Sequence, residues 1–129
     1  MDVYEFISRA PDERQDLLAA LHEGIIANDP VVIPAVKPLM GKQAILYEER
    51  WYMKYGLAGA KNHLSFHCLP MYMKPELHQK FEKLLPGASF QKGCINFKTA
   101  AELPVIKFTQ LVVECSKINI ADVLEKRKK

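Results

Sequence analysis

The chain has 129 residues, the size of one ordinary domain and too short for two. Its apolar fraction of 49% and charged fraction of 26% are typical of a globular protein and exclude wholesale disorder. The net charge of +3 resides in residues 124–129, so the rest of the chain is neutral, unlike a dedicated nucleic-acid binder.

The same survey bears on where the protein works. No apolar run approaches the roughly 18 residues that a membrane span needs. The first five residues carry acids where a secretory signal carries Lys or Arg. Three widely spaced cysteines without a CxxC pair predict free thiols in a reducing compartment. We therefore expect a cytoplasmic protein with no membrane partner, no specific nucleic-acid partner and a frayed basic tail at 124–129.

Charge is distributed unevenly along the chain. Residues 1–36 contain two basic and seven acidic side chains, whereas residues 37–123 contain twelve basic and seven acidic ones. The first part of the chain is therefore predicted to be an acidic helical element that lies on a basic body.

Two helices are predicted at the N-terminus. The sequence Asp2-Val3-Tyr4-Glu5 has the form of a capping box and predicts a short first helix. Pro11 is expected to open a second helix with acids in its first turn, and Asn28-Asp29-Pro30 to end it. Its apolar stripe consists of Leu17, Leu18, Leu21 and Ile25.

A three-stranded meander should follow. Prolines 30, 34 and 38 predict an irregular or extended stretch, and runs 43–48, 51–55 and 63–69 are rich in aromatic and branched residues. A tight turn is predicted at Glu49-Arg50 and a looser one within 56–61. Strand alternation is expected to send Trp51 and Tyr55 to one face and Lys54 to the other.

The second half predicts a helix, a hairpin and another helix. Pro75 begins a helix that Pro86-Gly87 ends, strands 89–91 and 94–98 flank a turn at Lys92-Gly93, and Pro104 opens the last main helix. Asn119 is expected to cap a short basic helix. The predicted fold is a two-layer α+β domain of order α-β-β-β-α-β-β-α. It has an antiparallel sheet of about five strands with helices on one face.

Carboxylates on the second helix form the first candidate site. At 100° per residue they share one stripe, and hard cations such as Fe²⁺ are held by such groups together with water. A solvated helix face is the alternative. The candidate metal ligands are Asp12, Asp16 and Glu23.

Two further surfaces are candidate binding sites. Lys61, Lys92 and Gly93 stand at predicted turns and could form an anion site if the fold brings them together. Aromatic and histidine side chains of the meander predict a ligand face or a homodimer interface if the helices cover only one side of the sheet. These residues are Tyr47, Trp51, Tyr55, His63 and His67.

Thiol chemistry has one candidate. Cys68 and Cys115 fall on apolar stripes and are expected to be buried. Cys94 follows Lys92-Gly93, and an exposed thiol near positive charge would have a lowered pKa. No histidine is placed beside Cys94, so the sequence predicts no catalytic constellation.

The ordered set of segments resembles the YdhG-like family, small α+β domains of mostly unknown function, some of them discussed as frataxin-like iron chaperones. The similarity is carried by residues 4–7, Pro11 with the leucine-rich helix, the run 59–67, the run 92–98 and the helix start at Leu103-Pro104. The resemblance implies an α-β(3)-α-β(2)-α fold and favours iron at the acidic helix. Residues 31–41 lack the carboxylates that family members often carry there, which weakens a metal function in that region.

We therefore interpret the chain as a non-catalytic binding or carrier module of unknown ligand, with iron delivery as the sharpest form of this hypothesis. One alternative is a homo-oligomeric interaction protein without a small ligand, which predicts an apolar interface over Trp51 and Tyr55. The other is a thiol-based enzyme or sensor that uses Cys94.

Overall fold

The computed structural model describes residues 1–127. The chain opens with α1 (Val3–Ser8), which is capped as predicted because the carboxylate of Asp2 accepts a hydrogen bond from the backbone N–H of Glu5 at 2.8 Å. Pro11 is the N-cap of α2 (Asp12–Asn28), and Asp29 ends this helix. The local sequence rules for both helices are therefore confirmed.

The centre of the fold is a six-stranded sheet whose neighbouring strands are all antiparallel. Its order is β1-β2-β3-β4-β6-β5. The strands are β1 (Ile33–Leu39), β2 (Lys42–Glu49), β3 (Tyr52–Gly59), β4 (Leu64–Cys68), β5 (Ser89–Phe90) and β6 (Cys94–Phe97). This arrangement confirms the predicted α+β class with an antiparallel sheet.

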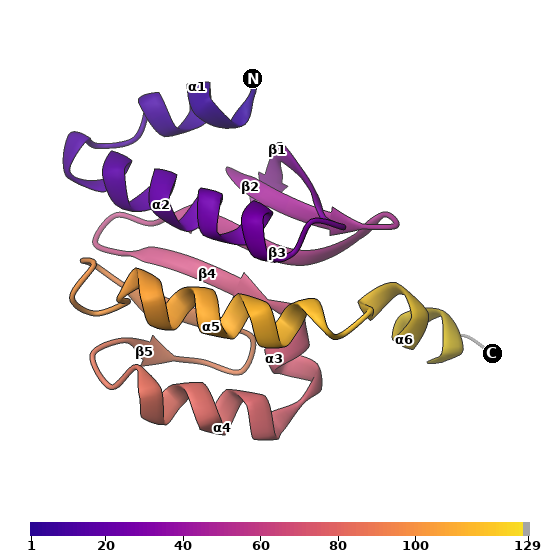
Figure 1. Ribbon diagram of the computed structural model, residues 1–129. Helices are drawn as coiled ribbons and strands as arrows, with labels where there is room; N and C mark the ends of the chain where they lie inside the picture. Colours follow the sequence, from indigo (N-terminus) through magenta and orange to yellow (C-terminus); the bar gives the residue numbers. More distant parts are fainter. Residues whose placement is uncertain (128–129) are drawn as a thin grey trace.

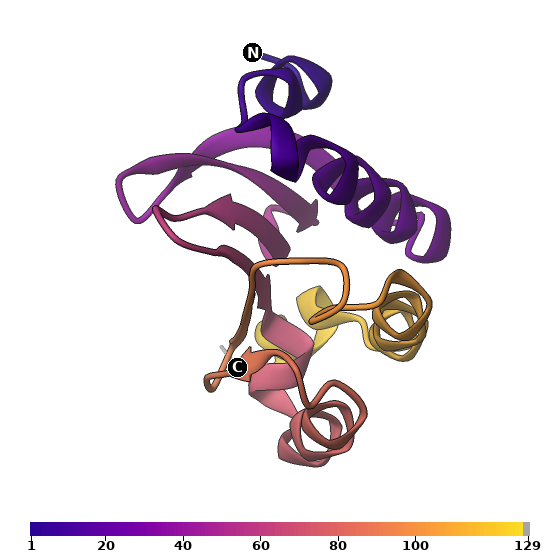
Figure 2. The same ribbon diagram turned by 90° about the vertical axis from the view of Figure 1, so that its left-hand side faces the viewer.

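Helices cover one face of the sheet. Figure 1 shows α2, α4 (Pro75–Leu84) and α5 (Val105–Ser116) running across that face, and the edge view of Figure 2 places them on one side of a curved sheet. The short α3 (Leu69–Met73) leads into α4. Helices α2 and α5 pack closely because Gly24 has no side chain: a Cβ there would lie 3.0 Å from Cγ2 of Thr109.

β1 is the strand that the sequence did not predict as a strand. Pro34 and Pro38 lie within it, and proline is tolerated in a sheet on an edge strand because it cannot donate to the ladder. β1 is the edge of this sheet, where it pairs with β2 from Ile33 opposite Glu48 to Leu39 opposite Lys42. The predicted count of about five strands is therefore one short.

The predicted face of Lys54 is wrong because β3 contains a bulge. Tyr47 pairs with Tyr55 and Glu48 pairs with Met53, so Lys54 is an extra residue on β3 without an opposing partner. A bulge turns the affected side chain away from strict alternation. Lys54 and Tyr55 are consequently both buried, and the turn lies one residue later than predicted, at Arg50-Trp51.

The C-terminal segment forms α6 (Ile120–Arg127) rather than a frayed tail as far as residue 127. Asn119 caps it as predicted, because its side-chain oxygen accepts a hydrogen bond from the N–H of Asp122 at 3.0 Å. Residues 128 and 129 of the predicted tail lie outside the described residues. Over residues 1–127, the helices are too short or too polar for any of them to cross a membrane.

Candidate ligand-binding site

A pocket of about 430 Å³ lies where α1 and the start of α2 meet the end of the sheet at which β2 begins and β3 ends. We call it the basic pocket. Its lining residues come from three separate parts of the chain, and they are Met1, Phe6, Arg9, Ala10, Pro11, Arg14, Leu18, Lys42, Gln43, Gly59, Ala60 and Leu64.

The floor of the basic pocket is apolar. Leu18 of α2 and Leu64 of β4 are buried, and Phe6 of α1 is half-buried and packs against the same core. Gly59, at the end of β3, leaves space above this floor because a Cβ there would meet only Nη1 of Arg14 at 3.5 Å and Cδ2 of Leu64 at 4.0 Å. The pocket therefore exists partly because position 59 has no side chain.

The rim of the basic pocket carries three cationic side chains. Arg14 donates hydrogen bonds to the backbone carbonyls of Ala60 at 2.7 Å and Lys61 at 3.1 Å, which fix the guanidinium without neutralising its charge. Arg9 pairs with Glu5 across an exposed helical turn at 3.1 Å. Lys42 has no ion-pair partner within residues 1–127.

No Asp or Glu lines the basic pocket. Glu13 and Asp16 of α2 instead border a separate shallow depression that includes Lys98. One side of α2 is thus acidic while Arg14 on another side contributes to the basic pocket. The two basic residues of the acidic stretch 1–36, Arg9 and Arg14, both line this pocket.

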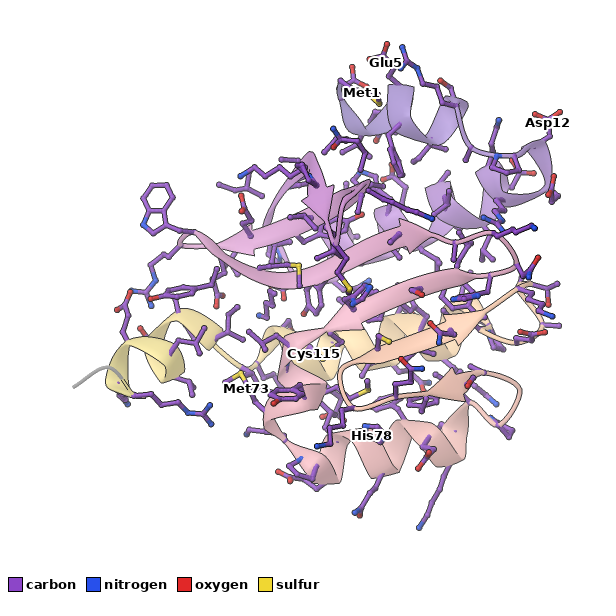
Figure 3. The ribbon with its side chains drawn as sticks, turned by 180° about the vertical axis from the view of Figure 1, so that it is seen from behind. Met1, Glu5, Asp12, Met73, His78 and Cys115 are labelled. Carbon is purple, nitrogen blue, oxygen red and sulfur yellow. The ribbon has the colours of Figure 1, made fainter. Side chains whose placement is uncertain are left out.

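The predicted metal ligands are not brought together. Asp12 contacts Gln15 Nε2 at 3.4 Å, and Figure 3 shows it at the periphery, pointing away from the sheet. Glu23 accepts a 2.7 Å hydrogen bond from Tyr4, and Asp16 is exposed. Within residues 1–127, no group of three or more His, Cys, Asp or Glu side chains is placed to hold a metal ion.

The predicted anion site does not form either. β4 runs antiparallel to β6, with Leu64 opposite Phe97 and His67 opposite Cys94. Lys61 precedes β4 and Lys92 precedes β6, so they lie beyond opposite ends of the same strand pair. A Cβ at Gly93 would meet the side chain of Tyr72 at 3.5 Å. Sequence spacing could not show that Lys61 and Lys92 are far apart, because their separation depends on how β4 and β6 pair in the sheet.

The predicted aromatic interface is divided between the core and solvent. Tyr47 and Tyr55 are fully buried on the helix-covered face, whereas Trp51 is 91% exposed at the tip of the β2–β3 hairpin. His63 and His67 are half-buried, and burial lowers the pKa of His67. An apolar interface over Trp51 and Tyr55 is therefore wrong, because only one of the two reaches the surface.

The predictions for the three cysteines are confirmed for two of them and not for the third. Cys68 and Cys115 are buried as predicted, with their Sγ atoms 3.6 Å apart. Cys94 is half-buried, and its thiol lies 3.3 Å from the Gln91 side-chain oxygen. Burial raises the pKa of Cys94, which is opposite to the lowered pKa that an activated thiol needs.

A buried polar cluster is the feature that sequence reasoning missed. The ammonium of Lys54 contacts Asp29 at 2.8 Å and Glu49 at 3.7 Å, and all three side chains are buried. Tyr55 donates to the same Asp29 oxygen at 2.6 Å. Glu49 also accepts from the N–H of Ala121 at 3.3 Å, so the cluster ties α2, the bulge and the start of α6 together. It lines none of the cavities described here, which indicates a structural role.

A second cleft, of about 590 Å³, lies between α3, α4 and the β5–β6 turn. It carries charges of both signs from Glu82 and Lys92, and His78, labelled in Figure 3, contacts the backbone carbonyl of Lys92 at 3.4 Å. Mixed charges favour no particular ligand. The basic pocket, with an apolar floor and charges of one sign, is the stronger candidate.

Comparison of the chain with models of protein families, with curated proteins and with solved structures finds no match. The resemblance to the YdhG-like family stays a prediction.

Proposed function

We propose that the protein is a non-catalytic binding or carrier module and that its ligand occupies the basic pocket. The observation that carries this proposal is a concave lining with apolar surface at Phe6 and Gly59, above the buried Leu18 and Leu64. The same lining has three cationic side chains and no carboxylate. Small-molecule sites in proteins are concave, largely apolar and 300–1,000 Å³ in volume, with a few polar groups that orient the ligand. The volume of about 430 Å³ suits one small molecule.

The lining chemistry supports binding rather than turnover. Acid–base catalysis uses His, Asp, Glu, Cys or a tuned Lys, and nucleophilic catalysis needs a nucleophile beside a base. The basic pocket has no His, Cys, Ser, Asp or Glu in its lining. The rival thiol-based function is disfavoured because burial raises the pKa of Cys94, which begins β6 opposite His67 and lies outside the basic pocket.

An organic ligand is favoured over iron. Hard cations are bound by gathered carboxylate oxygens, and the acids of α2 are dispersed between contacts with Tyr4, Gln15 and solvent. Three cations around the basic pocket would repel Fe²⁺. We therefore keep the carrier hypothesis, but with an organic ligand in place of iron and the basic pocket in place of the acidic face of α2.

The test is a two-dimensional NMR titration with a panel of small aromatic acids, amides and alcohols. Gly59→Val should fill the pocket from the sheet side, because a Cβ at position 59 fits with ordinary contacts. Ala58→Val adds two methyl groups to the opposite face of β3 and is the control. We expect shift changes around Ala10, Gly59 and Leu64 that Gly59→Val abolishes and Ala58→Val preserves. Shifts that map elsewhere, or that survive Gly59→Val, would contradict the proposal.

A further inference from the structure

The cations of the basic pocket differ in how far their charge is compensated. Within residues 1–127, the half-buried Arg14 donates to two neutral carbonyl oxygens and forms no ion pair, so its positive charge is not compensated. Arg9 is exposed and partly neutralised by Glu5. Lys42 is exposed at the start of β2 and, within the described chain, forms no ion pair.

The apolar surface of the pocket lies next to the cationic side chains and shares one opening with them. Leu18 shares α2 with Arg14, one helical turn further on. Leu64 pairs with Gly59 on the adjacent strand, directly opposite the space that Gly59 leaves. A molecule that enters past Gly59 would therefore meet apolar surface and positive charge at the same time.

We infer, on the basis of the proposed function, that the ligand is a small amphipathic anion, with a carboxylate or similar acidic head and a compact apolar body. The head lies between Arg14 and Lys42, and the body lies against Phe6 and Gly59, above the buried Leu18 and Leu64. Arg14 is the inner anchor because its guanidinium is held in place by Ala60 and Lys61, and charge-assisted hydrogen bonds from a fixed donor are the strong ones. Lys42 contributes attraction at the rim.

The exposure of Lys42 and the partial burial of Arg14 determine how strongly the pocket should prefer an anion over a neutral molecule. Exposed ion pairs are weak because water screens them, so Lys42 alone is expected to change affinity by about threefold. The half-buried Arg14 adds more, and we expect an anion to bind about tenfold more tightly than a neutral molecule of the same shape. The preference should shrink as salt is added, because screening acts on the charged head and not on the apolar body.

The matched probes are 2-naphthoate and 2-naphthamide, which share one ring system and differ by a single charge. Each is titrated by NMR into the wild type, Lys42→Gln, Gly59→Val and Lys107→Gln. Lys107→Gln removes the same charge from an exposed position on α5 and is the control. We expect naphthoate to bind at Gly59 and Leu64 about tenfold more tightly than naphthamide. Lys42→Gln should weaken only naphthoate, about threefold, and Lys107→Gln should change neither.

The possible failures are distinguishable. If both probes bind the pocket equally and Gly59→Val excludes both, the carrier function stands and the anionic class is wrong. If neither probe perturbs the pocket residues at millimolar concentration, both the ligand class and the proposed function are overturned. If naphthoate binding is stronger but unaffected by Lys42→Gln and by Gly59→Val, the anion binds elsewhere and the assignment of this pocket is wrong.

Discussion

The ammonium of Lys54 lies 2.8 Å from Oδ2 of Asp29, and both side chains are inaccessible to solvent. A lysine is buried in this way only where opposite charge compensates for lost hydration. Within residues 1–127, Oδ1 of Asp29 has no hydrogen-bond partner, and Lys54 Nζ meets Asp29 and Glu49 as ion pairs without hydrogen-bond geometry. The charge of Lys54 is therefore what compensates the two buried carboxylates. Through Glu49 the cluster also fixes the start of α6.

Lys54→Met should therefore lower the free energy of unfolding by about 3 kcal/mol or more, because it leaves two carboxylates buried without a counter-charge. Urea denaturation measures this loss. The triple change Lys54→Met, Asp29→Asn and Glu49→Gln should recover much of it, since it removes the uncompensated charges. A loss below about 1 kcal/mol in the single variant would show that the pair is hydrated in solution.

The two hairpins that flank β2 offer a matched test of backbone strain. Both use positive φ at the two central residues, with Met40 and Gly41 in one and Arg50 and Trp51 in the other. Such turns favour Asn and Gly, and a bulky residue in this region is strained. Because Trp51 is 91% exposed, Trp51→Gly should raise the free energy of unfolding by about 0.5 kcal/mol.

Gly41→Ala is the opposite experiment. A Cβ at Gly41 meets nothing within 4 Å, so its cost of about 1 kcal/mol would be purely conformational. Thermal or urea unfolding of both variants measures the pair of effects. A destabilising Trp51→Gly would mean that the indole makes a stabilising contact in solution.

The cysteines should differ sharply in reactivity. Cys94 is half-buried with a raised pKa, so in the native protein it should react with a thiol reagent more slowly than it does in the unfolded chain. Cys68 and Cys115 are buried and should react only after unfolding. Mass spectrometry after timed alkylation reports each site. Faster labelling of native Cys94 would revive a thiol-based function.

Acid should destabilise the fold below the ordinary pKa of histidine, 6.5. Burial lowers the pKa of His22, with Glu23 opposing in part, and burial also lowers the pKa of His67. The unfolded chain then binds protons more readily than the native state, so stability is present above pH 6.5 and is lost as pH falls below it. Urea denaturation at pH 7.5 and 5.5 should show this loss, and His22→Gln with His67→Gln should reduce it. If the double variant loses as much unfolding free energy between pH 7.5 and 5.5 as the wild type, groups other than these two histidines cause the loss.

Much of the fold is readable from local patterns. The cap at Asp2, the helix starts after Pro11 and at Pro75, and the buried cysteines 68 and 115 follow from neighbouring residues or from simple periodicity. Local patterns do not predict β1 as a strand, because its prolines are compatible with a sheet only at an edge and the edge position is decided by pairing with β2. The burial of Lys54 cannot be predicted from strand alternation, because one bulged residue reverses which side chains face the core.

The candidate site was harder to predict than the fold. Arg14, Lys42 and Gly59 belong to three elements, and their proximity exists only after β3 returns to the start of α2. The sequence predicts a turn within residues 56–61, whereas Gly59 ends β3 and leaves space for the pocket. The signal that could have indicated the site is the pair Arg9 and Arg14, two cations in an otherwise acidic stretch.

The central claim is that the basic pocket holds a ligand, and intermolecular nuclear Overhauser effects between 2-naphthoate and the protein test it most directly. We predict contacts from the naphthalene protons to the methyl groups of Leu18 and Leu64, and their disappearance in Gly59→Val. Contacts to Met71 in the second cleft instead, or contacts to Leu18 and Leu64 that persist in Gly59→Val, would contradict the account.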